Sequence, residues 1–246
     1  MRLRTILVKA LAVVITSASL AVAAPIELVT NGDFETGSFT GWTVTNQAGG
    51  EGDWFIDIPG TNTPLSDFQT AANPAGGSFY AVTDQPFIGT HSLTQTIVVP
   101  VSSQVIISFD YFVNDWSFAG PLGNVLDFNI APTQFATADI LTAGAGPFDT
   151  GAGVVANLVY AGGATLPAGN AYTPFLLDIT SLVGGGGTFQ LRFAEADNQL
   201  FLNFGLDNVS VLATPVPEPG TFGLLAAGLA AAVGAYRRRR AARRQG

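Results

Sequence analysis

The chain has 246 residues, of which 48% are hydrophobic and 11% charged, and it contains no cysteine. Without cysteine it can form neither disulfide bonds nor thiolate metal sites. Of its ten Lys and Arg residues only Arg192 lies between the terminal segments 1–24 and 214–246, against seventeen of its eighteen Asp and Glu residues, so this central region carries a net charge of −16. Such a charge argues against nucleic acid and anionic lipid as partners and favours divalent cations as counter-ions.

Residues 1–24 predict a secretory signal peptide. Three basic residues within the first nine precede an apolar stretch over 10–22, and small residues suit cleavage by signal peptidase after Ala23 or Ala24. A permanent N-terminal membrane helix is the alternative reading, but the apolar run is short and ends in small residues.

Residues 25–213 predict one all-β ectodomain, because helical periodicity is scarce and Gly, Thr, Asn and Pro recur. Strands are expected over 26–30, 41–45, 53–58, 79–83, 92–99, 105–112, 125–130, 154–160, 174–179, 188–195 and 206–212. Alternation over 188–195 places Phe193 on an apolar face and turns Arg192 the other way, toward solvent or an acidic neighbour. About eleven short strands in one unit predict two packed antiparallel sheets, a β-sandwich of the jelly-roll kind.

The two ends of this region carry a family resemblance. The opening stretch 28–42, which runs from Leu-Val-Thr-Asn-Gly-Asp-Phe-Glu to Trp42, and the closing Leu-Asp-Asn-Val-Ser-Val at 206–211 resemble galactose-binding-like jelly-roll domains, including carbohydrate-binding modules attached to xylanases. The alternating stretch 92–99 fits a strand of the same domains. Trp42, which closes the opening motif, is expected in the core.

The resemblance implies a structural calcium ion that joins the first strand to the last, held by Asp33, Glu35 and Asp207, with Asp33 using either its carboxylate or its carbonyl. Carboxylates from the two chain ends would repel one another unless a hard cation lay between them. The alternative is that Asp33 forms a turn and that Asp207 is an exposed residue before an apolar strand.

Aromatic residues offer a ligand site, since an aromatic face packs against sugar C–H groups. Trp54 and Trp116 are candidates for such a platform, and Asn114 and Asp115 beside Trp116 would bind sugar hydroxyls. The alternative reading is that these aromatic residues fill the core of the sandwich.

The signals for catalysis are weak, so no catalytic residues are predicted. His91 is the only histidine and no Gly-x-Ser-x-Gly sequence occurs, which argues against a Ser–His–Asp triad and against a zinc site. Glycoside cleavage needs a pair of carboxylates, and Glu195 and Asp197 are the nearest candidates; we expect both to be solvated.

The last 33 residues form a three-part signal. Val216-Pro217-Glu218-Pro219-Gly220 is followed by an uncharged run over 221–236 and then by Arg237, Arg238, Arg239 and Arg240. We expect this run to form a short transmembrane helix of roughly 24 Å, with the arginines in the cytoplasm. A buried helix followed by a basic nucleic-acid patch is the alternative, but the arginines lie at the extreme end of an exported chain.

This arrangement resembles the PEP-CTERM sorting signal of Gram-negative bacteria, which implies recognition and cleavage by an exosortase at the inner membrane. The expected protein is therefore a non-enzymatic component of the cell surface or extracellular matrix. A glycan-binding module that recognises exopolysaccharide is the alternative, and a glycosidase is a third.

Overall fold

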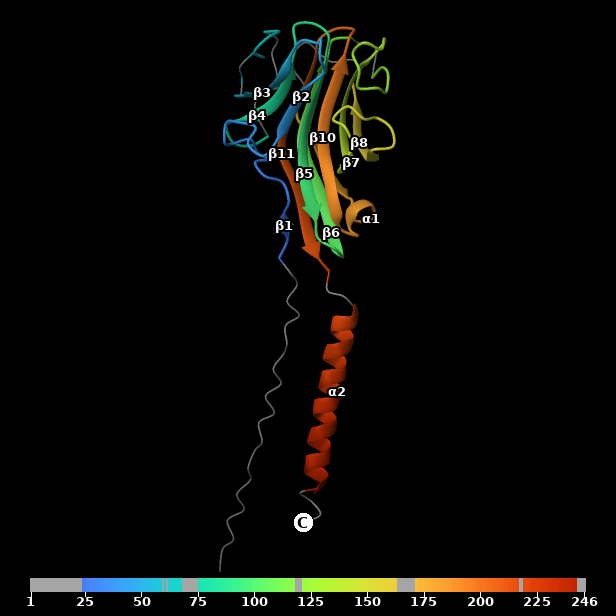
Figure 1. Cartoon of the computed structure of the whole chain (residues 1–246). Helices are drawn as coiled ribbons and strands as arrows, with labels where there is room; N and C mark the ends of the chain where they lie inside the picture. Colours follow the sequence, from blue (N-terminus) through green and yellow to red (C-terminus); the bar gives the residue numbers. More distant parts are fainter. Residues whose placement is uncertain are drawn as a thin grey trace, which may run out of the picture.

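The computed structural model describes residues 24–58, 60, 62–67, 75–117, 121–162, 171–216 and 219–242. Two antiparallel sheets pack face to face (Figure 1), which confirms the predicted β-sandwich. One sheet has the order β3-β4-β11-β6-β9, with β1 also paired to β11; the other has the order β2-β5-β10-β7-β8.

The strand bounds follow the predicted pattern closely, with several strands longer than expected. They are β1 Ile26–Glu27, β2 Thr43–Asn46, β3 Asp53–Asp57, β4 Tyr80–Asp84, β5 Gly89–Val99, β6 Ser103–Asp115, β7 Gln134–Thr142, β8 Val154–Ala161, β9 Thr173–Asp178, β10 Gly187–Asp197 and β11 Leu202–Pro215. A short helix, α1 (Thr180–Val183), precedes β10.

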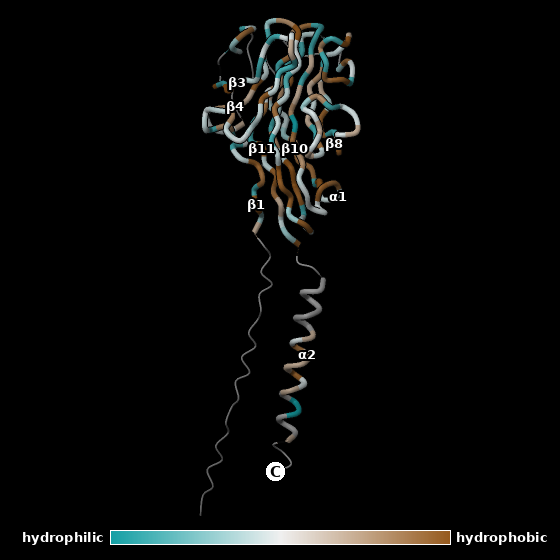
Figure 2. Tube along the Cα trace, in the orientation of Figure 1, coloured by the Kyte–Doolittle hydropathy of each residue, from teal (hydrophilic) through white to brown (hydrophobic). Residues whose placement is uncertain are grey.

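The core lies between the sheets because alternate residues of facing strands turn inward. Leu93 and Ile97 of β5 meet Phe193 of β10 and Phe109 of β6, and all four are at most 2% exposed. The rings of Phe109 and Phe193 pack edge to face at 5.1 Å. Hydrophobic residues, brown in Figure 2, accordingly run along the middle strands.

The opening motif packs against the last strand, as the resemblance predicted. Gly32 accepts a hydrogen bond from Val209 N at 2.8 Å, and a Cβ atom at position 32 would lie 1.9 Å from the Val209 carbonyl oxygen. Only glycine permits this approach. Trp42 is buried and its indole N–H donates to Asn31 O at 3.0 Å, so its predicted core position is confirmed.

One predicted strand is wrong. Residues 125–130 form turns, and the strand of this region is β7, which was not predicted. Leu126 packs with Phe135 and Ala194 from the turn, which explains the apolar residues that had suggested a strand there. β7 is buried on both faces up to its last residue, although its sequence alternates between apolar and polar residues over 136–140.

After β11 the chain forms helix α2 (Pro219–Ala242). Pro219 is its first residue, a position where proline is favoured. The helix is longer than the predicted run over 221–236 and includes Arg237 to Arg240, since arginine is itself a good helix former. Among the described residues, no helix combines the length and the hydropathy that a membrane span needs.

Candidate functional site

The structure brings two of the three predicted calcium ligands to one backbone segment. Glu35 Oε1 accepts hydrogen bonds from the backbone N–H groups of Ser78 and Phe79 at 2.7 and 2.9 Å, and Asp207 Oδ2 accepts one from Gly76 at 3.1 Å. Segment 76–79 therefore lies between a carboxylate of the opening motif and a carboxylate of the last strand. Asp33 is exposed and accepts a local hydrogen bond from Glu35 N at 3.3 Å.

Asp207 is fully buried, so the alternative of an exposed residue is wrong for it. Burial, together with the nearby negative charges of Asp110 and Glu35, raises the pKa of Asp207 to about 6. Among the residues that the structure describes, no group of three or more His, Asp and Glu side chains is arranged to hold a metal ion. The two carboxylates and the neighbouring Asp110 form a locally acidic site near the meeting point of the chain ends.

The predicted aromatic platform is corrected by the structure. Trp54 is 3% exposed and packs in the core against Phe204, with ring centroids 5.7 Å apart. Asn114 and Asp115, at the end of β6, are also buried, and Asp115 Oδ1 accepts from Gln134 Nε2 at 3.0 Å. Of the four predicted ligand residues only Trp116 is partly exposed, because the strand continues to Asp115 and carries its polar residues inside.

A cleft of about 400 Å³ lies instead on the outer face of the five-stranded sheet, over β7, β8 and β10. Alternation puts it there, since Leu191 and Phe193 point inward and Arg192 between them points outward. Its lining comes from three strands and the loops that join or precede them: Asn124, Phe135, Thr137, Asp139, Thr150, Val154, Asn157, Tyr160 and Arg192.

The floor of this cleft is a connected set of hydrogen bonds. Arg192 donates to Asp139 Oδ2 from Nε at 2.9 Å and from Nη2 at 2.6 Å. Asn157 Nδ2 donates to Asp139 Oδ1 at 2.9 Å and to Thr137 Oγ1 at 2.7 Å. Arg192 Nη1 also reaches the carbonyl oxygen of Pro147 at 3.2 Å and so holds the β7–β8 loop above the sheet. The predicted acidic neighbour of Arg192 is thus Asp139.

One wall of the cleft is aromatic. The rings of Tyr160 and Phe135 lie 5.2 Å apart, and the Tyr160 hydroxyl donates to the Gly123 carbonyl, which fixes the ring. Tyr160 is nevertheless 44% exposed. A partly exposed ring beside fixed amide, hydroxyl and carboxylate groups can bind a molecule that has both C–H faces and hydroxyl groups.

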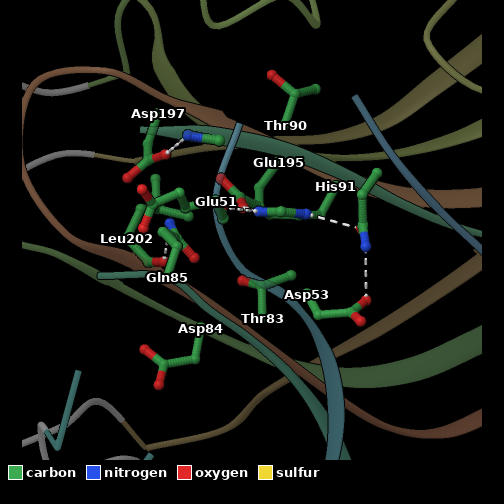
Figure 3. Close-up of polar contacts among 12 residues, drawn as sticks. Glu51, Asp53, Thr83, Asp84, Gln85, Thr90, His91, Glu195, Asp197 and Leu202 are labelled. Atoms are coloured by element: carbon green, nitrogen blue, oxygen red, sulfur yellow. Dashed lines mark hydrogen bonds and ion pairs between the residues drawn. The ribbon is translucent and has the colours of Figure 1, made fainter. Parts of the chain in front are cut away.

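A second polar group is buried between the sheets at the end of the sandwich where β5 begins. Glu195 and Asp197 continue the inward-facing row of Leu191 and Phe193, and both are at most 2% exposed, so the expectation that they are solvated is wrong. Figure 3 shows the carboxyl group of Glu195 beside the imidazole of His91, with a distance of 3.7 Å between Oε1 and Nε2.

The buried groups resist ionisation. Burial raises the pKa of Glu195 well above its usual value and that of Asp197 to about 7, and it lowers the pKa of His91 to about 4. His91 Nδ1 lies 2.8 Å from Asn46 Oδ1, and its Nε2 lies 3.0 Å from the Glu51 carbonyl oxygen. Among the described residues, the His91 ring thus contacts an amide, a carbonyl and a carboxyl group, and it contacts no hydroxyl that it could activate as a nucleophile.

The sorting residues sit directly beyond the sandwich. Val216 donates from its backbone N–H to Ser102 O at 2.8 Å, and Pro219 and Gly220 begin α2. Pro217 and Glu218 lie outside the described residues, as does the signal peptide up to residue 23. The predicted topology residues 237–240 are in the helix, where Arg237 and Arg238 are exposed.

Comparison with known families supports the reading of this segment. Residues 215–240 match the family model described as the PEP-CTERM protein-sorting motif. The chain therefore carries a sorting signal of the class that an exosortase processes, which implies export to the surface or exterior of a Gram-negative bacterium. A comparison with curated proteins gave no significant match.

Several solved structures have a similar fold. The TmCBM61 domain in complex with β-1,4-galactotriose shares 11% identity over 76% of this chain and 97% of that chain, with a TM-score of 0.46. The K1 cleaved adhesin domain of Lys-gingipain from Porphyromonas gingivalis W83 shares 11% identity over 79% of this chain and 99% of that chain, with a TM-score of 0.47. An apo cyclase from Fischerella sp. shares 14% identity over 79% of this chain and 98% of that chain, also with a TM-score of 0.47. At such identities and TM-scores no activity transfers to this chain.

Proposed function

We propose that the protein is a non-enzymatic component of the cell surface or extracellular matrix. A signal peptide directs its export, and the C-terminal segment, cut by an exosortase at the inner membrane, sorts it. The observation that carries this proposal is the sorting motif at 215–240, which follows directly on the last strand of a complete sandwich. After cleavage the helix and its arginines would be removed, and a strongly acidic ectodomain would be delivered.

The arrangement of acidic groups supports a role without catalysis. Cleavage of a glycosidic bond uses two carboxyl groups on opposite sides of the bond. Asp139 is the one carboxyl-bearing residue among those that line the cleft, and it is held by Arg192. Hydrolysis of a matrix polysaccharide by the pure protein would overturn this part of the proposal.

Mass spectrometry of the mature protein from its native cells tests the sorting step. We expect a C-terminus near Pro217, Glu218 and Pro219, and an N-terminus at Ala24 or Pro25. Replacing Glu218 with Gln should leave the C-terminal segment uncut, with the intact chain accumulating in the inner membrane. A wild-type chain that still ends at Gly246 would contradict the proposal.

The cleft supports a second, compatible function, the binding of a glycan from the extracellular polymer. Tyr160 offers a ring face to sugar C–H groups, while Asn124, Thr150 and Asn157 offer amide and hydroxyl groups to sugar hydroxyls. The volume of about 400 Å³ is within the usual range for a small-molecule site. Because Asp139 compensates the charge of Arg192, a neutral glycan suits this cleft better than an acidic one.

Glycan-array binding with two matched variants tests this function. Tyr160→Ala should abolish binding, because it removes the exposed ring at the cleft, whereas Trp116→Ala should leave binding intact. Circular dichroism should show that both variants fold. Loss of binding in Trp116→Ala alone would move the site to the β6 end, and an array without any bound glycan would refute the glycan-binding function.

We also propose a structural calcium ion near Glu35 and Asp207. Support comes from a fully buried Asp207 whose negative charge is opposed by those of Asp110 and Glu35, since a hard cation would relieve that repulsion. Such an ion would link the opening motif, segment 76–79 and the last strand, and would thereby stabilise the ectodomain without taking part in any reaction.

A further inference from the structure

The end of the sandwich from which the sorting segment leaves carries a ring of exposed apolar side chains. Val101 lies at the β5–β6 turn, Leu182 in α1 and Val216 just beyond β11, and they are 73%, 41% and 55% exposed. We name this set the apolar collar; it consists of Ile26, Val98, Val101, Leu182, Leu212 and Val216. Figure 2 shows hydrophobic residues, in brown, at the end that carries β1 and α1.

Backbone contacts hold these residues in one place. Val216 N donates to Ser102 O at 2.8 Å, and Ser103 N donates to Gly184 O at 3.3 Å. A Cβ atom on Gly186 would lie 2.8 Å from a Val101 methyl carbon, so the two turns are in contact. Ile26 joins them because β1 pairs with the end of β11, opposite Ala213. The collar is therefore a fixed surface and does not depend on the position of the tail.

The stretches that build the collar carry no formal charge. The stretches 98–104, 180–188 and 212–216, which build it, contain no charged residue, although the region 25–213 has a net charge of −16. The nearest carboxylates bind local backbone groups: Glu27 accepts from Val211 N at 2.8 Å, and Asp178 accepts from Thr180 N at 2.9 Å. An acidic protein is repelled by an anionic surface, and these uncharged stretches would meet lipid without such repulsion.

We propose that the apolar collar rests on the surface of the inner membrane while the sorting tail is still attached. This inference builds on the proposed sorting function, because it takes the tail to be in the membrane. Three residues, Val216 to Glu218, separate β11 from α2 and can span at most about 10 Å when extended. A tail held by lipid therefore keeps the collar at the lipid surface, where its apolar side chains leave water.

The contact has a consequence for processing. The uncharged run over 221–236 is short and rich in Ala and Gly, so its hold on lipid is modest. The collar adds apolar contact on the other side of the cleavage motif and fixes the motif at the membrane surface. Once the tail is cut, the link that kept the collar close is lost, and the acidic ectodomain leaves the membrane.

Site-specific fluorescence tests the proposal, because a chain without cysteine accepts a single labelled cysteine at any position. The mature chain from Ala24 to Gly246 is placed in phosphatidylcholine vesicles at less than one chain per vesicle. Val101→Cys and, as a second collar site, Leu182→Cys carry an environment-sensitive dye. Phe87→Cys is the control: it is 69% exposed but precedes β5, so the length of that strand, roughly 36 Å, separates it from the collar.

At both collar sites we expect dye emission at shorter wavelength and several-fold stronger quenching by lipid-attached quenchers than by aqueous iodide. The dye at Phe87→Cys should behave in the opposite way. If the chains float with the vesicles but iodide quenches the collar dyes as strongly as the control dye, this proposal alone would be overturned. Chains that do not float would overturn the membrane location of the tail and this proposal with it. Shielding that appears only at several chains per vesicle would assign the collar to a second copy and overturn the lipid contact.

Discussion

Arg192 Nη2 lies 2.6 Å from Asp139 Oδ2, and the two side chains, from adjacent strands of the five-stranded sheet, are at most 3% exposed. Arg192 is the only Lys or Arg residue between the terminal segments, so the one such cation of a strongly acidic ectodomain forms a buried ion pair. Asp139 also accepts from Asn157 and Thr137, which ties the pair into the floor of the cleft.

The pair predicts a clear asymmetry between single and double substitutions. Asp139→Asn keeps the shape of the side chain but leaves the buried Arg192 without a counter-charge, and it should lower the free energy of unfolding by about 3 kcal/mol. The double variant Asp139→Asn with Arg192→Met should recover part of this loss. Urea denaturation measures both; a single variant as stable as the wild type would show that the pair is not what holds this site.

The buried acids predict a stability that falls as pH rises. Between pH 4 and about 7 the folded chain keeps the Asp197 proton that the unfolded chain has already released, so raising the pH favours unfolding. Glu195 acts in the same direction. His91 acts oppositely but only between about pH 4 and 6.5, because its pKa is lowered on folding.

Asp197→Asn should remove the part of this dependence that Asp197 contributes. From pH 5 to 8 the wild type should lose about 3 kcal/mol relative to this variant, whereas the exposed control Asp67→Asn should follow the wild type. Thermal unfolding at each pH provides the measurement. Parallel profiles for the wild type and Asp197→Asn would mean that Asp197 titrates normally in the folded protein.

The calcium proposal predicts a ligand-dependent melting temperature. Calcium at about a hundred times its dissociation constant should stabilise the ectodomain by about 2.7 kcal/mol, and a chelator should reverse the effect. Asp207→Asn should abolish the response, and Asp67→Asn should retain it. A melting temperature that is the same with calcium and with chelator would refute the proposed calcium ion.

Substitution of Gly32 should show how much the contact between the opening segment and the last strand contributes to stability. In Gly32→Ala the new methyl group would lie 1.9 Å from the Val209 carbonyl oxygen, so the backbone must move and the hydrogen bond between these residues must weaken. We expect a loss of about 3 kcal/mol. Gly144→Ala is the matched control, since a Cβ atom there has no neighbour within 4 Å; equal stabilities would show that the opening segment adapts freely.

Local alternation in the sequence was enough to predict much of the sandwich. The stretches 92–99 and 188–195 place Leu93 and Phe193 in the core because a period of two assigns residues to the two faces of a strand. The strand β7 was not predicted although Thr137 and Asp139 alternate with Ala136 and Ala138, since alanine is a weak strand former.

The cleft and the buried acids could not be predicted from local sequence patterns, for a different reason. Asp139, Asn157 and Arg192 come together only because β10, β7 and β8 are neighbours in the sheet, an order that no single stretch encodes. A compositional signal did exist, since the single basic residue of an acidic region requires a partner. Glu195 and Asp197 seemed solvated because they end a strand, yet that strand extends to Asp197 and keeps them inside.

The position of β11 links folding to export. This last strand lies inside the six-stranded sheet, between β4 and β6, and pairs with β1 as well. Since β4, β6 and β1 all precede it in the chain, that sheet stays split and the interior stays open to water until β11 has crossed the membrane. If the tail halts translocation just past Pro215, as proposed above, the final strand joins its sheet before processing. The protease-resistant form of the ectodomain should then arise at the moment of arrest.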